Sequence, residues 1–166
     1  MLDKAIIRKV PKVELHEHLD GGLRPETIIE LAKERNVSIP SQDPRELREW
    51  FKRGCVQKSL SLYLETFSVT LSVMQDKEAL YRIAKEEILD LAKEHVVYAE
   101  IRFAPELHTK RGMNLEEVVT AVLKGLEAGR KETGTEFGLI LCAMRSEDPA
   151  LSLEVAELAV AFSDRG

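Results

Sequence analysis

Two histidines separated by one residue, His16 and His18, are the side chains of this chain best suited to chemistry. They fall in a stretch that predicts a strand over residues 13–19, and histidines two apart on a strand face the same way and can share one metal ion. Imidazole nitrogens are ordinary ligands of zinc and its neighbours. Gly21 and Gly22 interrupt the strand directly afterwards. We therefore expect the pair near the strand's carboxyl end, where α/β folds keep their chemistry.

The alternation of this strand predicts which side chains accompany the histidines. On a strict alternation Val13, Leu15 and Leu19 face the core, while Glu14 and Asp20 share the face of the two histidines. A row of carboxylates and imidazoles is costly to bury unless it is paired or ligated, which favours a metal site over a chance pair of histidines. Asp20 also has a plainer interpretation, as a turn residue that caps the following helix.

The rest of the chain alternates between helical and extended patterns. Strands are predicted at Val96–Phe103 and Phe137–Met144, because both are rich in aliphatic and aromatic residues, as parallel strands covered by helices usually are. Asp76 and Asn114 are typical helix N-caps, and the second is followed by Glu117 at the capping-box position. Helices are predicted over residues 3–10, 25–35, 44–51 (ended by Gly54), 59–74, 77–94, 115–132 and 149–163.

This order of elements predicts a parallel sheet built from strand–helix–strand units. An eight-fold barrel takes about 250 residues, and the chain offers three strand–helix units with a long helical insertion after the first. We expect an α/β fold in which residues 1–166 form the N-terminal portion of a single (β/α)8 TIM-barrel domain. Unpaired strand edges predict self-association of the chain or pairing with the other half of a barrel.

Composition excludes several classes of partner. The chain has 166 residues and a net charge of −5, without a basic stripe, so no nucleic acid is expected as a partner. No apolar run reaches the ~20 residues of a membrane span, and residues 1–12 lack the apolar core of a signal peptide. Cys55 and Cys142 lie far apart and outside any Cys-x-x-Cys, so we expect reduced thiols and a cytoplasmic protein.

Residues 11–21, with the sequence PKVELHEHLDG, resemble the first-strand signature of the adenosine deaminases, a family of the metal-dependent amidohydrolase superfamily. Three further segments agree in order and spacing: Tyr63–Phe67, Val97–Pro105 and Cys142–Arg145. The resemblance covers essentially the whole chain. It implies a zinc-dependent (β/α)8 barrel that hydrolyses adenosine and 2′-deoxyadenosine to the corresponding inosine and ammonia, in purine salvage.

The resemblance also implies roles for particular positions. His16 and His18 match the first two zinc ligands, and Asp20 matches the carboxylate that accepts a hydrogen bond from the ribose 5′-hydroxyl. An apolar helix covers the mouth of the pocket in this family, and a later segment lies near the purine. The residues thereby assigned to the nucleoside are His18, Asp20, Leu60, Tyr63, Leu64, Phe67 and Met144.

The catalytic proton-transfer residues of this family match no position in the chain. They belong to later strands of the barrel, so we expect them beyond Gly166 and assign no catalytic residue within residues 1–166. This chain alone is therefore expected to have little or no deaminase activity.

Several alternatives stay open on the residues alone. Apolar residues at helical spacing, such as Tyr63 and Phe67, usually form core. Glu100 and Arg102 share a strand parity, so they either support the site together with Glu14 or form a structural ion pair. The alternative functions are deamination of another 6-aminopurine, such as adenine or a modified nucleoside, and a non-catalytic half-barrel.

Overall fold

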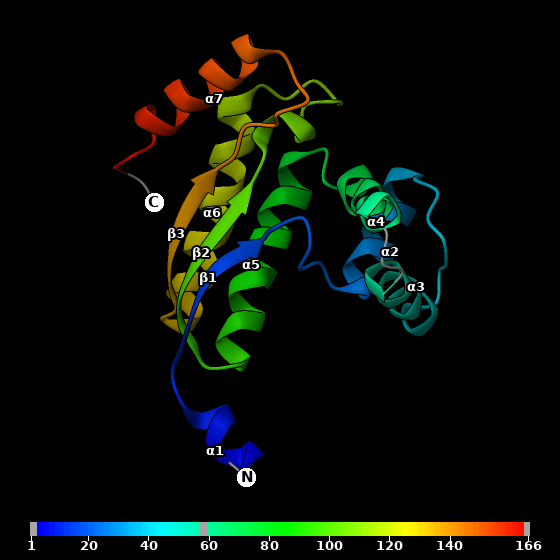
Figure 1. Cartoon of the computed structure of the whole chain (residues 1–166), viewed down its shortest axis with the longest axis vertical. Coiled ribbons are helices and arrows are strands. Elements are labelled where there is room, and N and C mark those ends of the chain that lie inside the picture. Colours follow the sequence, from blue (N-terminus) through cyan, green and yellow to red (C-terminus); the bar gives the residue numbers. More distant parts are fainter. Residues whose placement is uncertain (1–2, 57–59, 165–166) are drawn as a thin grey trace.

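The computed structural model describes residues 3–56 and 60–164, without the side chains of residues 5, 55 and 60–62. Its centre is one three-stranded parallel sheet in the order β1 (Lys12–His18), β2 (Val96–Phe103) and β3 (Glu136–Leu141). Helices α5 (Lys77–Lys93) and α6 (Leu115–Thr133) lie together against one face of this sheet (Figure 1). The predicted α/β fold with parallel strands and crossover helices is confirmed.

The other helices flank this sheet-and-helix unit. Helices α2, α3 and α4 contact one another and form a separate group beside α5, whereas α7 lies along the carboxyl end of the sheet (Figure 1). No helix in the described ranges is long and apolar enough to cross a membrane. The helices outside the sheet-and-helix unit have the following bounds: α1 (Lys4–Lys9), α2 (Pro25–Arg35), α3 (Pro44–Val56), α4 (Leu60–Val73), the 3-10 helix η1 (Pro105–His108) and α7 (Pro149–Ala161).

The hydrophobic core lies between the sheet and the α5–α6 pair. In β2 the side chains of Ala99, Ile101 and Phe103 are almost fully buried on this side, which we call the covered face. The alternate side chains of β2 take the opposite side, which we call the open face. Helices α5 and α6 approach so closely that a Cβ on Gly125 would lie 2.3 Å from the carbonyl oxygen of Tyr81. Only glycine allows such a contact between two helix backbones.

Predicted helix starts are confirmed by their hydrogen bonds. The Asp76 side chain accepts from the backbone N–H of Ala79 at 2.9 Å, which begins α5. Asn114 and Glu117 form a reciprocal capping box at the start of α6. These caps satisfy backbone donors that the first helical turn leaves free.

The largest errors in the predicted boundaries are at the ends of α3 and β3. Helix α3 does not end at Gly54 but continues to Val56, because Gly54 is buried and tertiary packing overrides its weak helix propensity. Strand β3 ends at Leu141 rather than Met144. The backbone N–H of Met144 donates to a carboxylate oxygen of Glu106 at 2.8 Å, which draws the chain away from the sheet.

Strand β1 does not follow a strict alternation. Glu14 pairs with Ala99 and Glu17 pairs with Ile101, so three steps along β1 match two steps along β2. One extra residue is therefore accommodated in β1, as in a β-bulge, with Leu15 and His16 together opposite one residue of β2. Paired residues of a ladder project to the same side, so Glu14 and Glu17 belong to the covered face.

The extra residue overturns part of the predicted pattern. Val13 and Leu15 are not in the core, since 55% and 56% of their surfaces are exposed, whereas Leu19 is buried as expected. Glu14 does not share the face of the histidines. His18 pairs with Arg102 and lies on the open face. A local irregularity of this kind shifts the parity of the strand, which the residue pattern alone does not reveal.

Candidate functional site

The two histidines lie side by side at the end of β1. The ring centroids of His16 and His18 are 5.1 Å apart, and the planes are inclined by 40°. Both side chains are exposed, and the backbone N–H of His16 donates to the carboxylate of Glu14 at 3.2 Å. Their two-residue spacing keeps the imidazoles on one side of β1, as predicted, although the irregularity breaks the alternation between Glu14 and these histidines.

The donor set of this pair fits part of a zinc shell. A catalytic zinc site uses three protein ligands and keeps a fourth position for water or substrate. His16 and His18 offer two imidazoles on a face that α5 and α6 leave open. Across the described part of the chain, no three His, Cys, Asp or Glu side chains gather closely enough to form a full site. The described residues therefore account for a pair of ligands rather than a complete shell.

Asp20 follows the strand in a tight turn, in which the backbone N–H of Gly21 donates to the carbonyl of His18 at 2.8 Å. The residue is only 9% exposed. Its Oδ1 lies 3.8 Å from Nδ1 of His18 and has no hydrogen-bond partner. Burial raises the pKa of this carboxyl above its usual range, and its own backbone N–H and nearby His18 partly oppose that shift. A buried acceptor without a donor is unusual in a native fold and marks a place for a ligand or water.

The alternative role of Asp20 as a helix cap is wrong. Helix α2 begins at Pro25 after an N-cap at Arg24, and no side chain caps it. The carboxylate of Asp20 is therefore not engaged by the following helix.

A cavity of about 890 Å³ lies between the carboxyl end of the sheet and helix α4. Its lining includes six of the seven residues assigned to the nucleoside by resemblance. Leu60 is the seventh, and its side chain is outside the described residues. The six are His18, Asp20, Tyr63, Leu64, Phe67 and Met144.

The resemblance assigns no proton-transfer residue to the lining of this cavity. Such residues are expected beyond Gly166, and Gly166 itself lies outside the described residues, which extend to Asp164. The expectation that proton transfer belongs to later strands therefore stays a prediction. The described part of the site consists of metal-ligand candidates and a pocket lining.

Helix α4 turns aromatic side chains toward this cavity. Phe67 lies with its ring centroid 6.5 Å from that of His18, in an edge contact, and 5.3 Å from that of Tyr63. Tyr63 is 39% exposed and Leu64 is 54% exposed, so these two residues are not core. The core interpretation of the whole stripe is thus wrong, because α4 belongs to the flanking helix group and not to the sheet layers.

Arg102 is expected from the sequence only as a support for the site or as a structural ion-pair partner, and Glu106 is not among the predicted site residues. The ion pair expected between Glu100 and Arg102 is absent from the described salt bridges. Arg102 instead lines the cavity, with its buried Nε unpartnered. The carboxylate of Glu106, in η1, accepts a hydrogen bond from the backbone N–H of Met144. Arg102 pairs with His18 in the β1–β2 ladder, so both side chains project from the open face. This pairing is the signal that places Arg102 at the cavity.

One buried acid was also missed by sequence reasoning. Glu87, on α5, is 7% exposed and lies against the turn after β1, where a Cβ on Gly22 would be 2.1 Å from its Oε2. Burial, and then the charges of Glu17 and Asp90, raise the pKa of Glu87 to about 8. Gly22 therefore packs directly against a carboxyl group that is largely uncharged at neutral pH, and a larger residue there would displace the Glu87 carboxyl.

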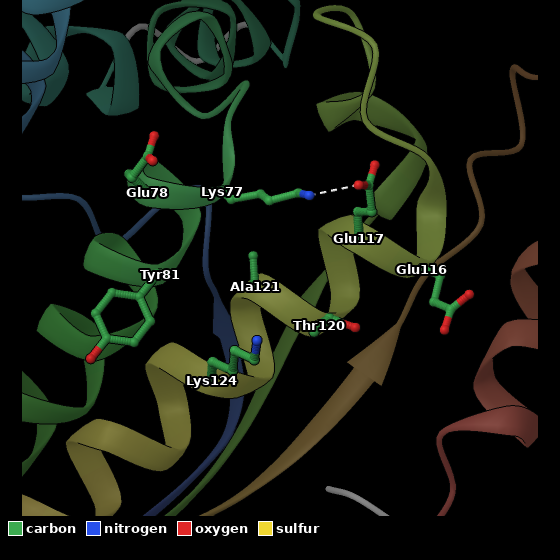
Figure 2. Close-up of a pocket in the computed structure, with 8 residues that line it drawn as sticks. All are labelled: Lys77, Glu78, Tyr81, Glu116, Glu117, Thr120, Ala121 and Lys124. Carbon is green, nitrogen blue, oxygen red and sulfur yellow. Dashed lines mark hydrogen bonds and ion pairs between the residues drawn. The ribbon is translucent and has the colours of Figure 1, made fainter.

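A second hollow, of about 410 Å³, lies between the first turns of α5 and α6 on the outer side of the molecule (Figure 2). Lys77 and Glu117 face each other across it and form an ion pair at 2.6 Å. Tyr81 lies at its edge and is 41% exposed. Its lining contains neither histidine nor cysteine, so it offers none of the metal-ligand candidates found beside the cavity at β1.

Comparisons with known proteins identify the family of this chain. Residues 11–166 match the family model of adenosine deaminase. An adenosine deaminase from Mycobacterium ulcerans is 49% identical over 166 residues, which is 96% of this chain and 45% of that protein. The chain thus spans less than half the length of this curated relative.

Solved structures of related enzymes share the fold. An N6-mAMP deaminase from Arabidopsis superposes with a TM-score of 0.81 at 27% identity, covering 98% of this chain and 49% of that one. An amidohydrolase from Burkholderia ambifaria with bound Zn superposes with a TM-score of 0.79 at 25% identity, covering 95% and 42%. The three strands described here thus form part of a (β/α)8 barrel, and the chain belongs to the adenosine deaminase family.

Proposed function

We propose that this chain contributes the first zinc ligands and much of the nucleoside pocket to a hydrolytic deaminase of adenosine and 2′-deoxyadenosine. The reaction replaces the 6-amino group of the purine with oxygen and releases ammonia. The observation that carries the proposal is the cavity of about 890 Å³, at which the apolar face of α4, the buried Asp20 and His18 meet. Family membership supports the same reaction class.

His16 and His18 are the residues that would hold the metal. A zinc ion held there would lower the pKa of water to about 7 and so would provide a nucleophile at neutral pH. Imidazole ligates a metal through a ring nitrogen in its neutral form. The bound Zn of the Burkholderia amidohydrolase supports this choice of metal.

The other residues of the cavity bind and orient the substrate. The unpartnered Oδ1 of Asp20 accepts a hydrogen bond from the ribose 5′-hydroxyl, which satisfies a buried acceptor. Tyr63, Leu64 and Phe67 cover the nucleoside and exclude water from it, and Met144 packs against the purine. An apolar wall with a few placed polar groups is the usual composition of a small-molecule site.

The remaining functional assignments follow from the same proposal. The partner is a small purine nucleoside, and the enzyme serves purine salvage in the cytoplasm. Cys142 is a free thiol, and burial raises its pKa, which makes it a poor nucleophile. The outer edges of β1 and β3 bear no described strand, and Val13 and Leu15 are exposed. We expect these edges to pair with further strands of a barrel.

The direct test follows the absorbance change from adenosine to inosine, with the full-length protein loaded with zinc. Turnover within the ~1–1000 s⁻¹ typical of enzymes is expected, and chelation should abolish it. Adenine and N6-methyladenosine serve as competing substrates in the same assay. Faster turnover of either one than of adenosine would contradict the proposed substrate.

The 166-residue chain alone tests the proposed pairing of strand edges. We expect it to elute as an oligomer and to bind a hydrophobic dye, because exposed apolar edges recruit other strands. Its deaminase activity should be near zero. A monomeric elution peak with a cooperative melt and no dye binding would show that these edges need no partner.

A further inference from the structure

A short connection, residues 74–76, joins the end of α4 to the start of α5 (Figure 1). We call it the joint. Helix α4 packs on α2 and α3, whereas α5 packs on α6 and β2. The direction in which α4 leaves the joint therefore sets where its aromatic side chains lie relative to the sheet. Met74 and Gln75 are 0% and 4% exposed, so the joint is buried rather than a surface loop.

The side chain of Gln75 ties the joint to η1. Its Nε2 donates to the carbonyl oxygens of Leu71 and Leu107 at 2.8 and 2.9 Å. Its Oε1 accepts from the backbone N–H of Lys110 at 3.1 Å. Both amide protons and the amide oxygen are thus engaged, and two of the three partners lie in η1 or directly after it. Such a bonded, buried side chain fixes two segments against each other.

His108 makes a second tie between η1 and the joint. Its ring is fully buried, and Nδ1 lies 2.9 Å from the carbonyl oxygen of Met74. A carbonyl oxygen can only accept, so Nδ1 carries the proton and donates. Burial lowers the pKa of His108 to about 4, so the imidazole is neutral at ordinary pH. Its centroid lies 5.6 Å from that of Phe103 in the core, which anchors this tie.

The last residue of the joint is bound to the flanking helices. The carboxylate of Asp76 caps α5 and also accepts hydrogen bonds from the guanidinium of Arg35, at the end of α2. Each of the three joint residues therefore has a partner outside α4 and the joint. The ties from η1 lead to the sheet, and the tie from Arg35 leads to the helix group that contains α4.

A small rotation at the joint would be amplified along α4. Tyr63 precedes Gln75 by about 18 Å of helix, so a rotation of about 10° would move it by about 3 Å. Leu71 and Gln75 line the same cavity as Tyr63 and Phe67, so α4 follows this cavity along much of its length. Misplacement by about 1 Å is enough to impair an active site.

We propose that Gln75 and His108 are positioning residues of the deaminase, which hold the joint so that α4 lies correctly over the nucleoside. The inference rests on the proposed function, in which Tyr63, Leu64 and Phe67 cover the substrate. When a tie is lost, only a fraction of the molecules holds α4 in its binding position, and the apparent affinity falls by that fraction. Saturating substrate restores the position, so KM should rise while kcat is retained.

Gln75→Met in the full-length zinc enzyme tests the first tie. Methionine keeps the length of the side chain and removes the three hydrogen bonds. One net hydrogen bond changes an equilibrium by about fivefold, so we expect KM for adenosine to rise by about tenfold and kcat to change by less than about twofold. Thr109→Val is the matched control, because the Thr109 hydroxyl bonds to the carbonyl of Glu106 rather than to the joint. An unchanged KM in folded Gln75→Met would overturn the inference.

His108→Leu and His108→Asn test the second tie by rescue. Leucine packs in the core but cannot donate to Met74, and should raise KM by about fivefold. Asparagine places an N–H donor near the former Nδ1 and should recover part of this loss, although it leaves a cavity and a polar group in the core. KM should therefore favour asparagine where the melting temperature favours leucine. If KM instead follows the melting temperature, His108 contributes packing alone.

Hydrogen exchange of the full-length protein needs no turnover, so it separates this inference from the proposed function. A helix of 14 residues is marginal in water without its tertiary contacts. Amides of α4 should therefore exchange faster in Gln75→Met and in His108→Leu than in the unaltered protein, whereas those of β2 and α6 should not change. Unchanged exchange of α4 in both folded variants would overturn the positioning role. Absence of adenosine turnover in the unaltered enzyme would overturn the proposed function instead.

Discussion

The two faces of the sheet differ in what covers them. On the covered face Ala99, Ile101 and Phe103 are buried against two helices that approach as closely as glycine allows. On the open face His18 and Arg102 are a register pair that lines a cavity, and neighbouring apolar residues remain exposed. Strand alternation thus separates core residues from candidate site residues within single strands. Changes on the open face should reduce function with little loss of stability, and changes on the covered face should do the reverse.

The largest expected effect comes from the open face. His18→Ala in the full-length protein should lose bound zinc and lower kcat/KM by about a thousandfold or more, because it removes a metal ligand. Zinc content by atomic absorption and the adenosine assay measure this, and His95→Ala, at a position far from the cavity, is the control. Stoichiometric zinc and normal turnover in His18→Ala would remove the metal assignment.

Glu87 is the polar exception on the covered side. Its pKa of about 8 lies above the ordinary 4.5. At a pH between these two values, Glu87 is protonated in the folded chain and ionised in the unfolded chain. Stability should therefore fall as pH rises from about 4.5 to 8, by up to about 1.4 kcal/mol per pKa unit. Glu87→Gln stays neutral and should raise the melting temperature far more at pH 8 than at pH 5.

The exposed Glu94→Gln is the matched control for Glu87→Gln. It should shift the melt by the same small amount at both pH values. A pH-independent effect of Glu87→Gln would show that the buried carboxyl does not titrate as its surroundings indicate.

Asp20→Ala refines the comparison within the open-face site. Loss of a hydrogen bond to a carboxylate is worth roughly 1.5–3 kcal/mol, or about a ten- to hundredfold drop in kcat/KM on adenosine. The drop on 5′-deoxyadenosine should be much smaller, since that substrate has no 5′-hydroxyl. Equal losses on both substrates would show that Asp20 does not meet this hydroxyl.

The smallest effect is expected from Gly125→Ala on the covered side. The added Cβ would lie 2.3 Å from the Tyr81 carbonyl oxygen, so α5 and α6 must separate. Overpacking costs about 1–3 kcal/mol, and the better helix propensity of alanine offsets about 1 kcal/mol of it. The melting temperature should drop by a few degrees, while KM for adenosine is unchanged. Lys124→Ala, one residue earlier and exposed, should leave the melt within error.

The sequence was sufficient for elements whose signals are local. Asp76 and Asn114 begin α5 and α6 as their cap chemistry predicts, because the hydrogen bonds involved span only three residues. The family motifs also placed His18, Asp20 and Met144 around one cavity. Their roles as ligand and substrate residues stay predictions.

The failures share a non-local cause. The face of the sheet on which Glu14 lies depends on its pairing with Ala99, some 85 residues later. The end of β3 depends on the hydrogen bond from the backbone N–H of Met144 to Glu106. Gly54 continues its helix because it is buried. Glu87 resembles the other charged residues of a solvated helix, and only the fold shows that it faces Gly22.

The irregularity in β1 has a consequence for how this strand tolerates insertions and deletions. Because β1 has one extra residue opposite β2, even-numbered residues face different sides in its two halves. Glu14 lies on the covered face and His18 on the open face. Deleting Leu15 would restore a continuous pairing from Glu14 to His18 without moving either end of the strand. The residue left opposite Glu100 would then be His16 alone, still on the open face. A single-codon deletion here is therefore expected to be far less damaging than one at Glu17, which would turn His18 toward α5.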